Sequence, residues 1–302
     1  MGEFRFGVNI GDGSDVVPYA REVERLGFDV LLASDHLGAP APFPLLAAAA
    51  VATERVRLGT YVVNVPFWNP SLLAREFATV DVISGGRVEV GLGSGHMKSE
   101  FDAAGIPWEG FDARADRLAG AIGELDRLFG DGGQQPLPVQ RPRPPLLIGG
   151  TSDRLLRLAA EHADIVAFAG IFQVKGAEPG KFRLSTAAEL DERVAFYRSL
   201  AGDRAGQRAG QRTGEQEHGL LLQWVEIGDD PRSVAERLRA EYELTASVDE
   251  LLDSPVLLLG SLDQAVERLH ELRRRYGVSY LVGHRRSFDG WSRVVQAIKG
   301  TG

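Results

Sequence analysis

The sequence predicts a (β/α)8 barrel, the TIM-barrel architecture, on three observations. Short apolar segments of strand length alternate with segments of helical periodicity along the 302 residues, and eight strands can be placed. The segment from Val30 to Ala33 is apolar without alternation, as in a strand buried on both faces of a parallel sheet. Asp35 and His36 follow directly where that strand ends, which is where a barrel binds its ligands. We therefore expect a single barrel domain over residues 1–302.

The first half of the chain supplies four strands and four helices. Ser14 or Asp15 can cap the first helix, which Gly27 ends. The fourth helix leads into a proline-rich connector, 136–145, which could be a domain linker or a long loop, and we favour the loop. The strands are expected at 4–9, 28–36, 56–63 and 87–93, and the helices at 15–26, 43–53, 71–83 and 112–129.

The second half supplies the remaining strands. A helix over 186–200 precedes a near-repeat, 201–212, which has no apolar anchor, and we expect a mobile loop within an insertion over about 171–218. The segment 255–259 resembles a ninth strand, but it is short and runs into the capping box of Ser261 and Gln264, so it is not counted. The strands are expected at 146–151, 165–168, 219–227 and 278–282, and the last helix ends near Lys299.

Composition excludes several classes of function. The chain has no cysteine, which excludes disulfides, thiolate catalysis and cysteine metal sites. Its net charge of −8 argues against a nucleic-acid partner, and no apolar run approaches the roughly 20 residues that span a membrane. The N-terminus has no signal-peptide pattern, so we expect a cytoplasmic protein.

Polar residues gather at the predicted strand ends. Adjacent residues such as Asp35 and His36 point to opposite sides of a strand, and the sequence has no closely spaced histidine pair, so a metal site is weakly supported. The strand ends supply Asn9, Asp35, His36, 61–64, 94–100, 149–151, 168–170, Glu226 and 284–286.

Each of these features also has a purely structural explanation. Gly149, Gly150 and Thr151 could cradle a phosphate at a helix N-terminus, or they could form a tight strand-to-helix turn, and the motif alone supports both equally. Glu100 could serve only to cap the next helix, and His36 could be a core histidine. Their placement at one edge of the sheet is what favours a functional site.

Several motifs resemble those of the bacterial luciferase-like flavin and deazaflavin oxidoreductases, over nearly the whole chain. The resemblance implies a barrel with loop insertions, usually dimeric, with a flavin or the deazaflavin coenzyme F-420 lying across the strand ends. The motifs are Ser34-Asp35-His36, residues 58–62 with Asn69-Pro70, residues 81–87 followed by 91–95 and Glu100, residues 145–151, and residues 260–264.

The Ser-Asp-His motif is more similar to the F-420 branch than to the FMN branch of that family. The resemblance implies that His36 is the acid/base histidine, that Glu100 is the active-site glutamate, and that a non-prolyl cis peptide joins Tyr61 to Val62. We further expect the cofactor to contact Asp35, Tyr61, Val62, Asn64, Gly93 and Ser94, with its phosphate at the helix N-terminus beside Gly149, Gly150 and Thr151.

Our leading hypothesis is a coenzyme F-420-dependent oxidoreductase that moves a hydride between C5 of the deazaflavin and a small organic substrate. An FMN-dependent monooxygenase is the alternative, and a non-catalytic flavin-binding relative is a third. Pro40 stands where the related sugar-phosphate dehydrogenases carry an aromatic residue, and their phosphate-binding lysines have no match. Reduction of an imine or activated alkene is therefore at least as plausible as alcohol oxidation. The small, apolar helices 43–53 and 71–83 predict a homodimer.

Overall fold

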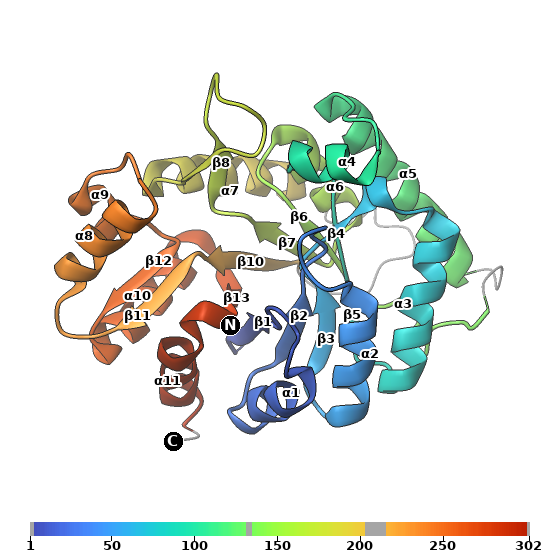
Figure 1. Ribbon diagram of the computed structural model, residues 1–302, viewed down its shortest axis with the longest axis horizontal. Coiled ribbons are helices and arrows are strands. Elements are labelled where there is room, and N and C mark those ends of the chain that lie inside the picture. Colours follow the sequence, from blue (N-terminus) through green and yellow to red (C-terminus); the bar gives the residue numbers. More distant parts are fainter. Residues whose placement is uncertain (1–2, 131–134, 203–215, 301–302) are drawn as a thin grey trace.

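A computed structural model describes residues 3–130, 135–202 and 216–300, and these form the predicted barrel (Figure 1). Parallel pairing runs through the strands in the order β3-β2-β1-β13-β10-β7-β6-β5, and pairing of β3 with β5 closes the barrel. The barrel strands are β1 (Arg5–Asn9), β2 (Val30–Ala33), β3 (Arg57–Thr60), β5 (Val88–Gly93), β6 (Leu146–Gly149), β7 (Ile165–Phe168), β10 (Glu217–Leu222) and β13 (Val278–Gly283).

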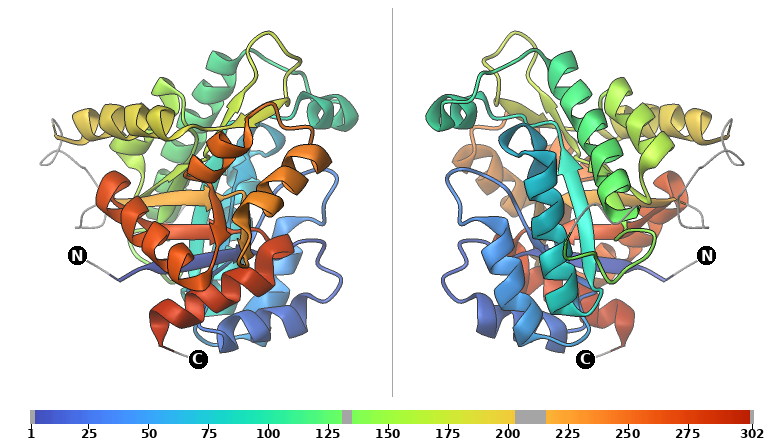
Figure 2. Two further views of the ribbon diagram at one scale, coloured as in Figure 1. Left: turned by 90° about the vertical axis from the view of Figure 1, so that its left-hand side faces the viewer. Right: turned by 90° about the vertical axis from the view of Figure 1, so that its right-hand side faces the viewer.

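Helices surround these strands, as the two side views show (Figure 2). Their apolar faces pack on the barrel wall in one large buried cluster, while a smaller cluster fills the barrel interior around Leu32, Leu147 and Tyr280. No helix in the described part of the chain is long and apolar enough to cross a membrane. The surrounding helices are α1 (Val16–Arg25), α2 (Pro42–Ala52), α3 (Pro70–Ser84), α5 (Phe111–Gly130), α6 (Asp153–His162), α7 (Ala187–Gly202), α10 (Leu262–Tyr276) and α11 (Phe288–Lys299).

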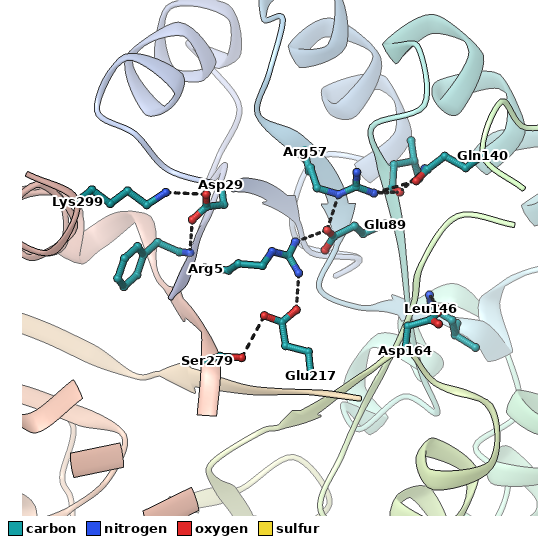
Figure 3. A network of polar contacts seen from close by, with 12 residues as sticks. Arg5, Asp29, Arg57, Glu89, Gln140, Leu146, Asp164, Glu217, Ser279 and Lys299 are labelled. Carbon is teal, nitrogen blue, oxygen red and sulfur yellow. Dashed lines mark hydrogen bonds and ion pairs between the residues drawn. The ribbon is translucent and has the colours of Figure 1, made fainter. Parts of the chain in front are cut away.

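Charged side chains gather at the N-terminal end of the barrel strands (Figure 3). Arg5 at the start of β1 pairs with Glu217 at 2.5 Å and with Glu89, and Arg57 reaches Glu89 at 2.6 Å. Glu89 is almost completely buried, so its charge depends on these two arginines for compensation. Gln140 from the proline-rich connector donates to Asp81 on α3, which ties that loop to the same end of the molecule.

The predicted strand 219–227 is wrong in its second half. β10 ends at Leu222, the Gln223 backbone N–H donates to the carbonyl of Val256, and β11 (Trp224–Ile227) pairs with β12 (Leu257–Gly260) outside the barrel. The segment 255–259, which we did not count, therefore contributes a strand after all. Apolar residues stand on both sides of Gln223, so the sequence pattern does not reveal that the chain changes its pairing strand there. The capping box of Ser261 and Gln264 is confirmed.

Several loop elements have no counterpart in the sequence prediction. They are α4 (Lys98–Ala104), α8 (Pro231–Glu241), α9 (Val248–Asp253), the short strands β4 (Val63–Asn64), β8 (Ile171–Gln173) and β9 (Phe182–Leu184), and two 3-10 turns, η1 (Val65–Phe67) and η2 (Arg285–Ser287). β8 and β9 form an antiparallel hairpin in the insertion expected over 171–218. Most of the 201–212 repeat lies outside the described residues, and its mobility stays a prediction.

Candidate functional site

A cavity of about 910 Å³ lies at the carboxyl ends of the barrel strands. Its size suits a cofactor-sized ligand, for which pockets of about 300–1,000 Å³ are usual. The structure brings all the predicted catalytic and cofactor-binding residues to its wall: Asp35, His36, Tyr61, Val62, Asn64, Gly93, Ser94, Glu100, Gly149, Gly150 and Thr151.

His36 and Glu100 form the polar centre of this cavity. His36 follows the end of β2, and Glu100 lies in the first turn of α4, after the glycine-rich end of β5. The imidazole Nδ1 lies 2.7 Å from Oε1 of Glu100. The His36 side chain keeps 41% of its surface exposed and that of Glu100 keeps 17%, so the histidine is the more accessible partner. Such a pair can orient an imidazole for proton transfer.

Asp35 is tied into the barrel wall rather than directed at His36. Its Oδ2 accepts hydrogen bonds from the Asn64 backbone N–H at 3.0 Å and from Trp68 Nε1 at 2.9 Å. Burial raises the pKa of the Asp35 carboxyl, and the two hydrogen bonds act against that rise. Asp35 therefore fixes the end of β2 against the segment that follows β3.

That segment contains a cis peptide bond between Tyr61 and Val62, as the family resemblance implied. Val62 projects over Gly93 of β5 and Gly149 of β6. A Cβ atom at Gly93 would lie 2.6 Å from Val62 Cγ2, and one at Gly149 would lie 3.3 Å from Val62 Cγ1. β5 therefore needs glycine at position 93 for the bulge at Val62 to fit into the mouth of the barrel, while a side chain at position 149 would require Val62 to shift by a few tenths of an ångström.

Four polar atoms around the cavity are buried without a hydrogen-bond partner in the described structure. They are Asn9 Oδ1, Tyr61 OH, Asn64 Oδ1 and His284 Nε2. Burial lowers the pKa of His284 to about 4, so this histidine is neutral near pH 7. Buried polar groups are usually paired, so these atoms indicate a ligand that supplies uncharged donors and acceptors.

The turn from β6 into α6 lies on the cavity wall. Ser152 caps α6, and its Oγ accepts from the Leu155 N–H. The Gly150 N–H donates to the Ala167 carbonyl at 3.0 Å, so it is not a donor for an anion. The N–H groups that begin α6 have no partner inside the helix and can serve instead. This shifts the candidate anion site from Gly150 towards Thr151, Ser152 and Asp153.

The sequence prediction missed part of the site, and several of the strand-end residues that it named, among them Glu226, 97–99 and 285–286, do not line the cavity. Glu226 lies on β11, where its Oε2 accepts from Trp224 and pairs with Arg237, and it is not part of the cavity wall. Gln223 lines the cavity in its place, together with the missed residues Trp108, Arg114, Phe172 and Phe182. His96, within the predicted strand-end range 94–100, lines the cavity as expected. Among the described residues, no three His, Asp or Glu side chains meet as a metal site would require.

Comparison with known proteins points to one family. A sequence model described as luciferase-like monooxygenase matches residues 6–279. An F-420-dependent glucose-6-phosphate dehydrogenase of Intrasporangium calvum is 38% identical over 126 residues, which cover 38% of each chain. An FMNH2-dependent dimethylsulfone monooxygenase of Pseudomonas putida is 33% identical over 131 residues, which cover 39% of this chain and 36% of the relative. The matches thus span less than two fifths of either relative's length.

The fold recurs in solved structures. An F-420-dependent secondary alcohol dehydrogenase in complex with an F-420–acetone adduct superimposes with a TM-score of 0.78 over 100% of both chains, at 16% sequence identity. At that identity the superposition supports the fold alone.

Proposed function

The chain belongs to the luciferase-like monooxygenase family, and from that premise we propose that it is a coenzyme F-420-dependent oxidoreductase acting on a small organic substrate. The observation that carries the proposal is the 2.7 Å contact between His36 and Glu100 at the edge of a cavity large enough for cofactor and substrate together. The matching segment of the F-420-dependent glucose-6-phosphate dehydrogenase supports the choice of coenzyme.

The cavity residues fit a deazaflavin in three respects. The bulge at Val62 offers an apolar support for a planar ring, and Gly93 and Gly149 leave room beneath it. The unpartnered atoms of Tyr61, Asn64 and Asn9 can bond to the polar edge of the ring. The start of α6 can receive the phosphate of the side chain. We assign Asp35 to the same site through its bond to the Asn64 backbone.

When bound, the deazaflavin supplies or accepts a hydride at C5. The protein's own task is to orient the substrate and to handle the accompanying proton. We assign that proton to His36, because an imidazole titrates near neutrality and its side chain is accessible from the cavity. Glu100 holds the His36 ring through Nδ1, which leaves Nε2 for the exchange. One hydride and one proton together reduce a C=N, C=C or C=O bond, and removal of a hydride and a proton from an alcohol in the reverse direction gives a carbonyl.

FMN-dependent monooxygenation is the second candidate, because the Pseudomonas putida enzyme matches a segment of similar length. A non-catalytic role is less well supported, since a paired histidine and glutamate serve no evident structural purpose at an open cavity. We further propose a homodimer that uses α2 and α3, where Val51, Leu72, Val82 and Ile83 expose large apolar side chains. The cytoplasmic location stays a prediction.

Parallel fluorescence titrations of the purified protein with F-420 and with FMN test the choice of coenzyme. We expect saturable binding of F-420, at least about tenfold tighter than that of FMN, which corresponds to about 1.4 kcal/mol. Saturable binding of FMN with no response to F-420 would replace the proposal with the monooxygenase.

A further inference from the structure

The hairpin of β8 and β9 forms an aromatic wall of the cavity near His36. Phe172 and Phe182 both line the cavity from this hairpin. The Phe182 ring lies 5.2 Å from the ring of His96, edge to face, and His96 lies 5.5 Å from His36 in the same manner. Three rings therefore run in contact from the proposed proton-transfer residue to the hairpin. In Figure 2 the hairpin segment and α4, which carries Glu100, lie at the same end of the molecule.

This wall is fixed in place by contacts at several points. The Val174 N–H donates to the Lys181 carbonyl at 2.8 Å across the hairpin, and the Ser185 N–H donates to Gly170 at 2.9 Å where the hairpin leaves the barrel. Arg183 forms two bonds with Glu189 at the start of α7, at 2.9 and 2.5 Å. A preorganised wall loses less conformational entropy when a ligand binds to it.

The charges around the cavity favour a neutral substrate. Among the described lining residues the only lysine or arginine side chains are Arg114 and Arg193, and both are engaged. The Arg114 guanidinium lies 3.7 Å over the Trp108 ring and donates to the carbonyls of Ser94 and Glu109. Arg193 pairs with Asp153 and with Glu192, each at 2.5 Å.

Three carboxylates, those of Asp35, Glu100 and Asp153, line the same cavity. With the start of α6 assigned to the phosphate of the coenzyme, a substrate phosphate monoester would bring a further negative charge without a free cation or a second anion site to receive it, which is unfavourable in a partly enclosed site. An uncharged aromatic ring could instead pack against Phe172, Phe182 and His96.

We propose that the substrate is an uncharged molecule with an aromatic body, seated against Phe182 and Phe172, with its reacting carbonyl, alkene or imine group towards His36. This inference rests on the proposed function and names the substrate class of that same site. It makes Phe182 a residue that determines specificity rather than one that takes part in the chemistry.

The test uses the protein loaded with oxidised F-420, which has no hydride to donate. An enone can therefore bind to this complex but is not reduced by it. Benzylideneacetone is the neutral aromatic probe, ethylideneacetone lacks the ring, and phenyl phosphate carries the ring with a dianion. The chain has no cysteine, so the enones meet no thiol. Binding is read from the coenzyme fluorescence and, independently, from saturation transfer to the probe in NMR spectra.

We expect benzylideneacetone to bind at least about tenfold more tightly than ethylideneacetone, and phenyl phosphate to bind more weakly than either. Phe182→Ala should weaken benzylideneacetone about tenfold and leave ethylideneacetone nearly unchanged. Leu184→Ala is the matched control, because Leu184 lies on the same strand but not on the cavity wall. It should leave both enone affinities unchanged.

Tighter binding of phenyl phosphate, no binding of benzylideneacetone, or an unchanged affinity in Phe182→Ala would each overturn the inference. An equal loss in Leu184→Ala would also overturn it, since a loosened hairpin would then explain the effect. Failure of F-420 itself to bind would refute the proposed function together with this inference. Normal F-420 binding without preference for the neutral aromatic probe would refute the inference alone.

Discussion

The Nδ1 atom of His36 lies 2.7 Å from Oε1 of Glu100, a contact between the end of β2 and the first turn of α4. It joins two residues that are 64 positions apart in the sequence. The glycine-rich end of β5 carries the chain to α4 and so brings the carboxylate over the mouth of the barrel. An imidazole held at one nitrogen presents the other for proton transfer.

Glu100→Gln tests whether the charge of the carboxylate matters. Glutamine keeps a side chain that can bond to Nδ1 but removes the negative charge that stabilises a protonated ring. We expect kcat to fall at least about tenfold with F-420 affinity within about twofold of the wild type. An unchanged kcat across the pH range would show that Glu100 only positions the ring or the helix.

Ser152→Asp tests the anion site at α6. Aspartate is as good an N-cap as serine, so the helix should be preserved while a carboxylate is placed beside the proposed phosphate. We expect about tenfold weaker F-420 binding, and the loss should shrink at high salt. Ser152→Asn caps the helix without charge and should bind F-420 normally. Gly150 is less suitable, since its φ of +148° and a Cβ position 2.4 Å from Leu155 would strain the fold. Equal affinity of both Ser152 variants for F-420 would show that the phosphate binds elsewhere.

The sequence could predict the barrel because its strands are marked by uninterrupted apolar runs such as Val30 to Ala33, each followed by a helical pattern. The same local logic placed His36 at a strand end. The family resemblance placed Glu100 in the same active site, but its contact with Nδ1 of His36 was not predicted, because no local pattern shows that α4 folds back over the strand ends.

Elements that depend on long-range pairing could not be predicted. The chain leaves the barrel at Gln223 because β11 pairs with β12, and nothing in the sequence 219–227 marks this change of pairing strand. Phe182 reaches the cavity only through the hairpin with β8, so its part in the wall is a tertiary property. The connector 136–145 was correctly expected to be a loop, but its bonds to Asp81 were not foreseen.

The burial of His284 predicts how the free energy of unfolding depends on pH. Its pKa falls from about 6.5 in the unfolded chain to about 4 in the fold, because burial opposes the charged ring. The unfolded state therefore binds more protons, and stability is lost as the pH falls from about 6.5 to about 4. The loss is at most about 3.5 kcal/mol, since the pKa falls by about 2.5 units and each unit corresponds to about 1.4 kcal/mol.

Urea unfolding at about pH 7.5 and about pH 5 measures this effect. His284→Gln should lose less stability on acidification than the wild type does. His270→Gln, at an exposed position on α10, is the control and should behave as the wild type. A wild type and a His284 variant with the same pH dependence would contradict the assignment.

The homodimer can be tested by sedimentation. We expect a species of twice the chain mass of 32.7 kDa, which Val51→Glu and Ile83→Glu together should convert to monomer. Tyr242→Glu changes a similarly exposed residue at the end of α8, which Figure 1 shows on the other side of the barrel, and should leave the dimer intact. A wild-type protein that sediments only as a monomer would remove the claim.

The most direct test of the account is hydride transfer by His36→Asn, measured with F-420 affinity in the same protein and with the neutral substrate that the probe series identifies. Asparagine keeps a polar side chain of similar reach but removes the titrating group. If His36 exchanges the proton, turnover at saturation should fall about 10²- to 10⁴-fold while the Kd for F-420 stays close to that of the wild type. Near-full turnover with an unchanged pH profile would contradict the account.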